Sequence, residues 1–166
     1  MGENGSGKST LIEALAILMG FNPEGGNRNF RVKTAEAHAN LDEFLQPTRS
    51  PRRMRNGFFL RAESHFNVAS YIDAVGGAHN YGGKFLHEQS HGESFFALLQ
   101  HRLTGDGLSI MDEPEAALSP TRQLSMLTRL HDRVRQGAPF IIATHSPILM
   151  ADPMPITSCR VKARPI

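Results

Sequence analysis

The sequence has almost no cysteine, little net charge and no long hydrophobic run. Cys159 is the only cysteine in 166 residues, which excludes an intrachain disulfide and a cysteine-based zinc site and suits a reducing cytoplasm. The formal net charge of +2 is too small to indicate a nucleic-acid partner by itself. No apolar run approaches membrane-spanning length, and the N-terminus lacks the basic-then-apolar pattern of a signal peptide. We therefore expect a cytoplasmic protein without membrane insertion.

The composition is otherwise that of a folded domain. Hydrophobic residues make up 40% of the chain and charged residues 20%, and the length suits one domain with a modest core. Strand-like segments at 57–63, 107–111 and 139–146 alternate with helical patterns, which predicts an α/β fold with a largely parallel sheet flanked by helices. We expect a single domain over 1–152 and, because of its prolines and lack of period, an irregular tail over 153–166.

Helices are expected where hydrophobic spacing and start signals coincide. Ser64, Ser119 and Ser146 are candidate N-caps, and Pro120 suits the first helical position. The expected helices cover 8–19, 64–75, 93–104 and 120–136, with a further one starting after Ser146. Their hydrophobic stripes are Leu11, Leu15 and Leu18; Phe96, Leu99 and Leu103; and Leu124, Leu127, Leu130 and Val134. The segments 30–36, 38–46 and 47–56 are read as a strand, a short helix and an exposed loop.

A glycine-rich segment at the N-terminus carries the clearest chemistry. Residues 2–9 read GENGSGKS and match the P-loop pattern G-x-x-x-x-G-K-[ST] at every fixed position. Glycines let backbone N–H groups converge on a polyphosphate, and the start of the following helix adds a favourable dipole. We expect Lys8 to reach the β- and γ-phosphates and Ser9 to ligate Mg²⁺. The expected nucleotide-binding residues are Gly2, Asn4, Gly5, Ser6, Gly7, Lys8, Ser9 and Thr10.

Two adjacent acidic residues follow the strand expected at 107–111. The carboxyl ends of parallel strands are where α/β sheets bind ligands. Asp112 would hold the Mg²⁺ sphere through water, as a Walker B aspartate does, and Glu113 would orient and deprotonate the attacking water. Two acids after a strand ordinarily form only a solvated turn. Together with the P-loop, they indicate a site for Mg²⁺ and ATP.

The order of four motifs resembles the ABC-type ATPase superfamily. After the P-loop come SHGES (90–94), MDEPEAALSP (111–120) and ATHSP (143–147). The pattern is most similar to the soluble RecF-like and SMC-like members, often labelled AAA-family ATPases, and it covers roughly 1–10 and 57–152. The resemblance implies a P-loop NTPase fold, ATP hydrolysis, and a homodimer in which two chains enclose two Mg-ATP molecules head to tail.

The resemblance also implies roles for residues outside the P-loop. Ser90 and Gly92 lie in a segment similar to the signature motif, which in one subunit caps the γ-phosphate bound by the other; His91 stands where glycine is usual. His145 resembles the switch histidine that senses the γ-phosphate. Glu63 occupies the Q-loop position, where glutamine is usual, and could join the metal's water shell. The residues expected to carry catalysis are Glu113, His145 and Lys8.

Three alternatives remain open at this stage. In the ABC-type family a strand and an adenine-stacking aromatic residue precede the P-loop, so we expect a fold whose first strand is missing and an N-terminally incomplete chain. An inactive fragment, a transporter's nucleotide-binding subunit and an ATP-dependent DNA-repair or chromosome-associated ATPase are the alternatives. DNA or an unidentified effector protein would then be a partner. Five arginines form a candidate DNA-contacting loop, for which a solvated loop is the simpler interpretation: Arg49, Arg52, Arg53, Arg55 and Arg61.

Overall fold

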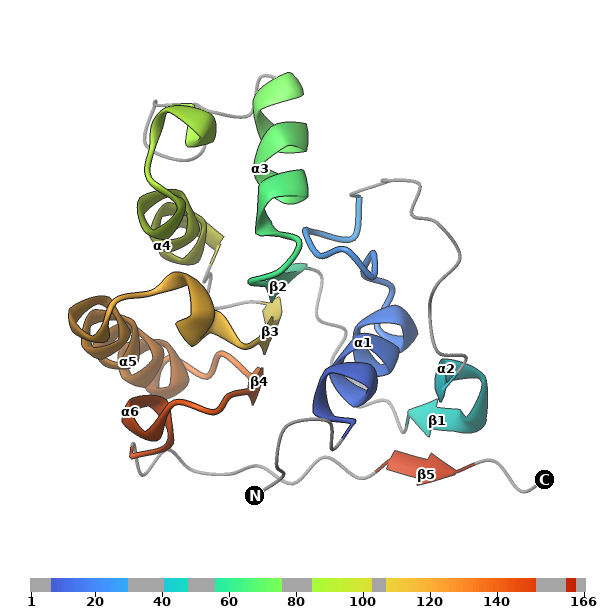
Figure 1. The fold of residues 1–166 in the computed structure, drawn as a ribbon. Helices are drawn as coiled ribbons and strands as arrows, with labels where there is room; N and C mark the ends of the chain where they lie inside the picture. The colour runs from blue at the N-terminus through green and yellow to red at the C-terminus, as the bar shows by residue number, and fades with distance from the viewer. Residues whose placement is uncertain are drawn as a thin grey trace.

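The computed structural model describes residues 7–29, 41–47, 56–75, 85–102, 107–151 and 161–163. Over these ranges the protein is mixed α/β, with a small parallel sheet in the strand order β2-β3-β4 (Figure 1). The three strands are β2 (Asn56–Arg61), β3 (Gly107–Asp112) and β4 (Phe140–Ala143). This confirms the predicted α/β class and the parallel sheet flanked by helices. The described residues do not test the expectation that the first strand is missing.

Helices cover both faces of this sheet. α1 (Lys8–Leu18) packs on one face, and α3 (His65–Ala74), α4 (His91–Arg102) and α5 (Pro120–Arg135) pack on the other (Figure 1). The shorter helices are α2 (Leu41–Phe44), α6 (Pro147–Met150) and the 3₁₀ helices η2 (Leu86–Glu88) and η3 (Pro114–Ala117). Among the described residues, no helix is both long and apolar enough to cross a membrane.

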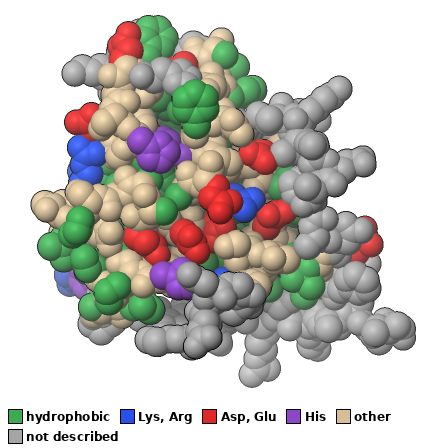
Figure 2. Space-filling model, viewed as in Figure 1, with side chains coloured by type: hydrophobic (Ala, Val, Ile, Leu, Met, Phe, Trp, Pro, Cys, Tyr) green, Lys and Arg blue, Asp and Glu red, His purple; other side chains and the backbone are tan. Residues whose placement is uncertain are grey.

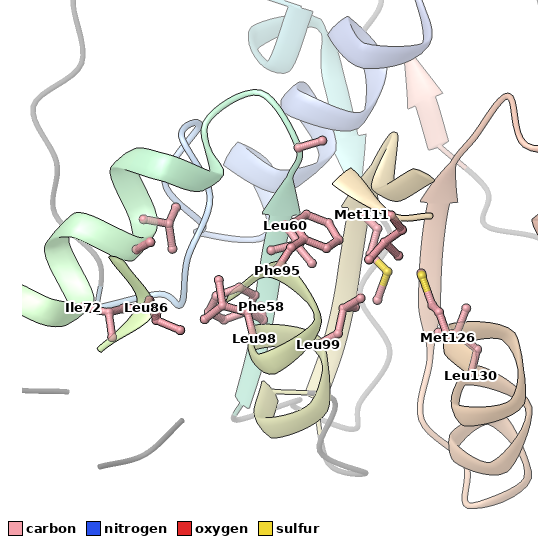
Figure 3. Close-up of a cluster of buried hydrophobic side chains, with 14 of the residues drawn as sticks. Phe58, Leu60, Ile72, Leu86, Phe95, Leu98, Leu99, Met111, Met126 and Leu130 are labelled. Carbon is pink, nitrogen blue, oxygen red and sulfur yellow. The ribbon is translucent and has the colours of Figure 1, made fainter. Parts of the chain in front are cut away.

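The strand β2 supplies both hydrophobic cores because successive side chains of a strand point to opposite faces. Phe58 and Leu60 lie in the larger core with α3, α4 and α5, whereas Phe59 lies in the smaller core under α1. Figure 3 shows the larger core, in which Phe95 and Met111 pack close to Leu60. The central strand β3 is buried along its whole length, as expected for a strand covered on both faces.

Two of the expected helix starts are confirmed. Ser119 caps α5, accepting a 3.4 Å hydrogen bond from the N–H of Arg122, and Ser146 caps α6, accepting from the N–H of Leu149 at 3.3 Å. The prediction that Ser64 caps α3 is wrong in its chemistry. Ser64 occupies the N-cap position, but its hydroxyl donates a 2.6 Å hydrogen bond to the carbonyl of Glu24. That bond ties the start of α3 to the turn that follows α1.

The predicted hydrophobic stripes are wrong in part. Leu11 and Leu124 are 44% and 55% exposed. Leu15, Leu99 and Leu130 are buried as predicted. The buried faces also contain residues outside the predicted stripes: Ile12, Ala14 and Ala16 in α1, Phe95 and Leu98 in α4, and Met126 in α5. A stripe drawn through leucines overlooks the alanines of α1, whose small side chains allow the helix to lie close to the sheet.

The remaining expectations fall on segments described only in part. The expected strand at 30–36 and most of the expected loop at 47–56 lie outside the described residues. The segment 38–46, expected to be a short helix, contains α2. This helix is followed directly by the strand β1 (Leu45–Pro47). β1 pairs antiparallel with β5 (Val161–Ala163), so the tail over 153–166 contains a strand that the sequence pattern did not indicate.

Candidate functional site

The N-terminus of α1 meets the carboxyl end of β3. Ser9, in the first turn of α1, donates a 3.2 Å hydrogen bond from Oγ to Oδ1 of Asp112. Gly7 precedes the helix at φ 77°, a left-handed conformation that glycine adopts without strain. The structure therefore brings together the two residues expected to hold Mg²⁺. Lys8 and Thr10 belong to the same first turn, and the other expected P-loop residues, Gly2, Asn4, Gly5 and Ser6, lie outside the described part of the chain.

Asp112 is a buried carboxylate whose negative charge is only partly compensated by its neighbours. Its residue surface is 5% exposed, and this burial raises the pKa of the Asp112 carboxyl, against the opposing effects of Arg61 and of the hydrogen bond from Ser9. One carboxylate beside one hydroxyl fits Mg²⁺, which in nucleotide sites keeps several waters and takes phosphate oxygens as further ligands. No cluster of three His, Cys, Asp or Glu side chains that could hold a metal ion occurs among the described residues, and a site of this kind does not need one.

Arg61, at the end of β2, connects three carboxylates from three segments. Its Nη1 lies 3.0 Å from Oε2 of Glu13, its Nη2 lies 3.3 Å from Oε2 of Glu63, and its Nε lies 3.6 Å from Oδ2 of Asp112. Figure 2 shows acidic side chains gathered in the middle of one face of the molecule, with a basic side chain among them. The Arg61 side chain is only 15% exposed, so it is not part of a solvent-facing DNA loop, and for this residue that hypothesis is wrong.

Glu63 lies beside this network without entering the core. Its side chain is 82% exposed, and its carboxylate lies 3.3 Å from the Arg61 guanidinium. An exposed carboxylate two residues beyond a buried arginine is accessible to water, and its role in a metal's water shell stays a prediction. The other four arginines of the proposed DNA-contacting loop lie outside the described residues.

Glu113 and His145 lie side by side at the ends of neighbouring strands. Oε1 of Glu113 is 3.4 Å from Nε2 of His145, and the Glu113 N–H donates a 2.9 Å hydrogen bond to the carbonyl of Ala143. Among the described residues Glu113 is the one non-glycine with positive φ (48°), a left-handed conformation that costs about 1 kcal/mol or more outside glycine. Such strain is found preferentially at functional sites. The turn after β3 thereby directs Glu113 toward His145.

The expected signature residues form the start of α4. The N–H and the hydroxyl of Ser90 both donate to Oε2 of Glu93, at 3.0 and 2.7 Å, and Glu93 pairs with Arg122 at 3.4 Å. The hydrogen bond from the Ser90 side chain is the largest cause of a lowered pKa at Glu93. A Cβ on Gly92 would lie 2.9 Å from the carbonyl oxygen of Ala117, so this position requires glycine for packing within the chain.

Within one chain, Ser90 and Gly92 lie away from the contact between Ser9 and Asp112. α4 lies on the face of the sheet opposite α1 (Figure 1). Within the chain, Ser90 lies at the start of α4 and is bonded to Glu93 of the first turn, which agrees with the simpler interpretation that the motif begins a helix. A role toward a nucleotide would have to be exerted on a second chain, and it stays a prediction.

Comparison with known proteins adds no relative: no family model, no curated protein and no solved structure matches this chain. The function is therefore inferred from the chain's own residues.

Proposed function

We propose that this chain binds and hydrolyses ATP as an ATPase of the ABC-type class and dimerises around Mg-ATP. The observation that carries the proposal is the 3.2 Å hydrogen bond between Ser9 and Asp112, which joins the helix after a glycine-rich segment to the end of a buried strand. The contact of Glu113 with His145 at the adjacent strand end supports it. A hydroxyl, a buried carboxylate, a second acid and an imidazole thus occur along one edge of the sheet.

The binding roles follow from charge. ATP brings several negative charges, which the Lys8 ammonium and the backbone N–H groups at the start of α1 would neutralise. The Ser9 hydroxyl and the Asp112 carboxylate would hold Mg²⁺. When bound, this ion neutralises charge on the phosphate oxygens and withdraws electrons from them. Arg61 keeps the Asp112 carboxylate oriented from its other oxygen, at 3.6 Å.

The hydrolytic roles follow from position. The Glu113 carboxylate would accept a proton from a water molecule as that water attacks the γ-phosphorus and the bond from this phosphorus to the β–γ bridging oxygen breaks, which releases ADP. A positioned base of this kind contributes about 10²–10⁴-fold to a rate. The His145 imidazole, 3.4 Å from Glu113, would donate a hydrogen bond to a γ-phosphate oxygen. Ser90 and Gly92 would complete the site from the second chain, and the Ser90 hydroxyl would then exchange the Glu93 carboxylate for phosphate.

The substitution Glu113→Gln tests this proposal. It should lower kcat by about 10²–10⁴-fold and preserve ATP binding, because it removes the base and leaves Ser9, Lys8 and Asp112 unchanged. An ATP-bound dimer should accumulate in light scattering after size exclusion, and should be absent with ADP. Asp132→Asn, an exposed acid on α5, is the matched control and should behave as wild type. A Glu113→Gln protein that turns over ATP at the wild-type rate, or that stays monomeric with ATP, overturns the proposal.

A further inference from the structure

The carboxylate of Glu115 reaches from the 3₁₀ helix η3 to the turn that follows β4. Its Oε1 accepts hydrogen bonds from two consecutive backbone N–H groups, those of His145 and, at 3.0 Å, Ser146. Its Oε2 is buried and has no hydrogen-bond partner within the described part of the chain. These two backbone bonds are therefore the polar contacts that hold the carboxylate. Hydrogen bonds to an ionised acceptor are about twice as strong as neutral ones.

The turn at residues 144–146, here called the switch turn, is also held from its other side. Ser146 donates from its hydroxyl to Oε1 of Gln123 on α5 at 2.6 Å, and this contact is buried. The Gln123 amide in turn donates to the carbonyl of Leu118 at 3.0 Å. Ser146 also donates from its backbone N–H to the Thr144 hydroxyl at 3.0 Å. The switch turn thus lies between α5 and η3, and Glu115 provides its contact with η3.

Glu113 and Glu115 hold the same histidine at two points. The Glu113 side chain lies 3.4 Å from the His145 ring, and the Glu115 side chain binds the His145 backbone N–H. Between the two glutamates stands Pro114, whose ring fixes its own φ and so limits the freedom of this segment. A fixed backbone at His145 limits where its imidazole can lie relative to Glu113.

We propose that Glu115 is a positioning residue that fixes the switch turn and thereby sets the placement of the His145 imidazole beside Glu113. The inference rests on the proposed function for its effect on hydrolysis, but its structural half applies to the protein without nucleotide. Glu115 does not touch the reacting atoms; it acts through the backbone of His145. An acceptor oxygen at this position is required, because one oxygen, Oε1, accepts both N–H bonds.

The structural half is tested in the nucleotide-free protein by the imidazole ¹H–¹³C resonances of the histidines, with His145 assigned from a His145→Gln variant. Glu115→Ala should shift or broaden the His145 resonance and leave that of His131 unchanged. Glu115→Gln, which retains an acceptor oxygen, should give a smaller change, and this variant also covers the case in which Glu115→Ala does not fold. Asp132→Ala, which removes an exposed carboxylate from α5, is the control. An unchanged His145 resonance in both Glu115 variants overturns the inference.

The kinetic half is tested by a double-mutant cycle with His145. Glu115→Ala should lower kcat by roughly tenfold and change the KM for Mg-ATP by less than about twofold, because the two lost backbone hydrogen bonds affect hydrolysis only through the placement of His145. In a His145→Ala background the same substitution should have no further effect on kcat, because Glu115 acts through that residue. Effects of the two substitutions that multiply independently would show a general structural role and overturn the inference. If the wild-type protein does not hydrolyse ATP, the proposed function fails, and the nucleotide-free resonances still decide the role of Glu115.

Discussion

Both carboxylate oxygens of Asp112 have a partner on a different segment. Oδ1 accepts the hydrogen bond from Ser9, 103 positions away in the sequence, and Oδ2 lies 3.6 Å from the guanidinium of Arg61. Arg61 is in turn paired with Glu13 and Glu63. The orientation of Asp112 is thus fixed by α1 and β2 together, so a metal ion would meet a carboxylate that is already in place.

Asp112→Asn should weaken Mg-dependent ATP binding without lowering the stability of the folded protein. Burial raises the pKa of the Asp112 carboxyl above its ordinary 3.8, so ionisation destabilises the folded state increasingly as pH rises from about that value. In EDTA at pH 7 the variant should therefore melt at the same or a higher temperature than wild type, with about 2–4 °C for each kcal/mol gained. The difference should shrink as pH falls well below 3.8, where the Asp112 carboxyl becomes protonated in the folded and the unfolded state alike. Mg-dependent ATP binding should fall at least about tenfold. A variant that is less stable than wild type at pH 7 would contradict this account of Asp112.

Arg61→Met should destabilise the protein strongly. It leaves Glu13 and the buried Asp112 without their common cation, and removing one partner of a buried ion pair costs about 3–5 kcal/mol. Urea denaturation measures the change in the free energy of unfolding. Glu63→Gln is the matched control: its carboxylate is 82% exposed, and the loss should be at most about 1 kcal/mol. Equal losses for the two variants would show that the network around Arg61 is not buried in solution.

His65 should make the stability of the protein depend on pH. The side chain is 1% exposed and shares a 2.8 Å hydrogen bond with Ser94, and burial, with a smaller effect of His91, lowers its pKa from 6.5 to about 4. A histidine with a lowered pKa in the folded state contributes stability above pH 6.5 that is lost as pH falls toward 4, by up to about 3 kcal/mol. Urea denaturation at pH 7.5 and pH 4.5 should show this loss, and His65→Gln should reduce it. The same pH dependence in both proteins would assign the effect to other groups.

Gly92→Ala should destabilise the start of α4. Alanine favours helix formation, but its Cβ would lie 2.9 Å from both the carbonyl oxygen of Ala117 and Nη1 of Arg122, so η3 must move. Overpacking of this kind costs about 1–3 kcal/mol. Gln100→Ala, at an exposed position of the same helix, is the control and should leave the stability unchanged or slightly higher. If the Gly92→Ala protein is as stable as the Gln100→Ala protein, packing within the chain does not require glycine at position 92.

Local pattern predicted the elements that carry the site. The apolar run before Asp112 and the run before His145 both became strands of the sheet, and the ends of these two strands bring Glu113 within 3.4 Å of His145. These residues follow strands directly, so their positions depend mainly on strand pairing, which a hydrophobic run predicts well. The P-loop itself is described only from Gly7 onward. The helix predicted to begin at Lys8 does begin there.

The contacts that hold those residues could not be predicted in the same way. The sequence pattern grouped Arg61 with the loop arginines. The pairing of β2 with β3 instead brings its side chain beside Asp112. The sequence pattern assigned no role to Glu115, whose carboxylate accepts two N–H groups from the turn that follows β4. In both cases the partner lies on a segment distant in the sequence, and a single sequence without its tertiary pairing does not indicate such partners.

The most direct test of the central claim is an equilibrium titration of the purified chain with ATP, in Mg²⁺ and in EDTA, beside Lys8→Ala. Wild type should bind ATP saturably and more tightly with Mg²⁺, and Lys8→Ala should bind at least about tenfold more weakly with an unchanged circular-dichroism spectrum, because an ammonium facing the phosphates is lost. Binding by Lys8→Ala with the wild-type affinity, or no saturable binding by the wild-type chain, would contradict a phosphate site at the start of α1.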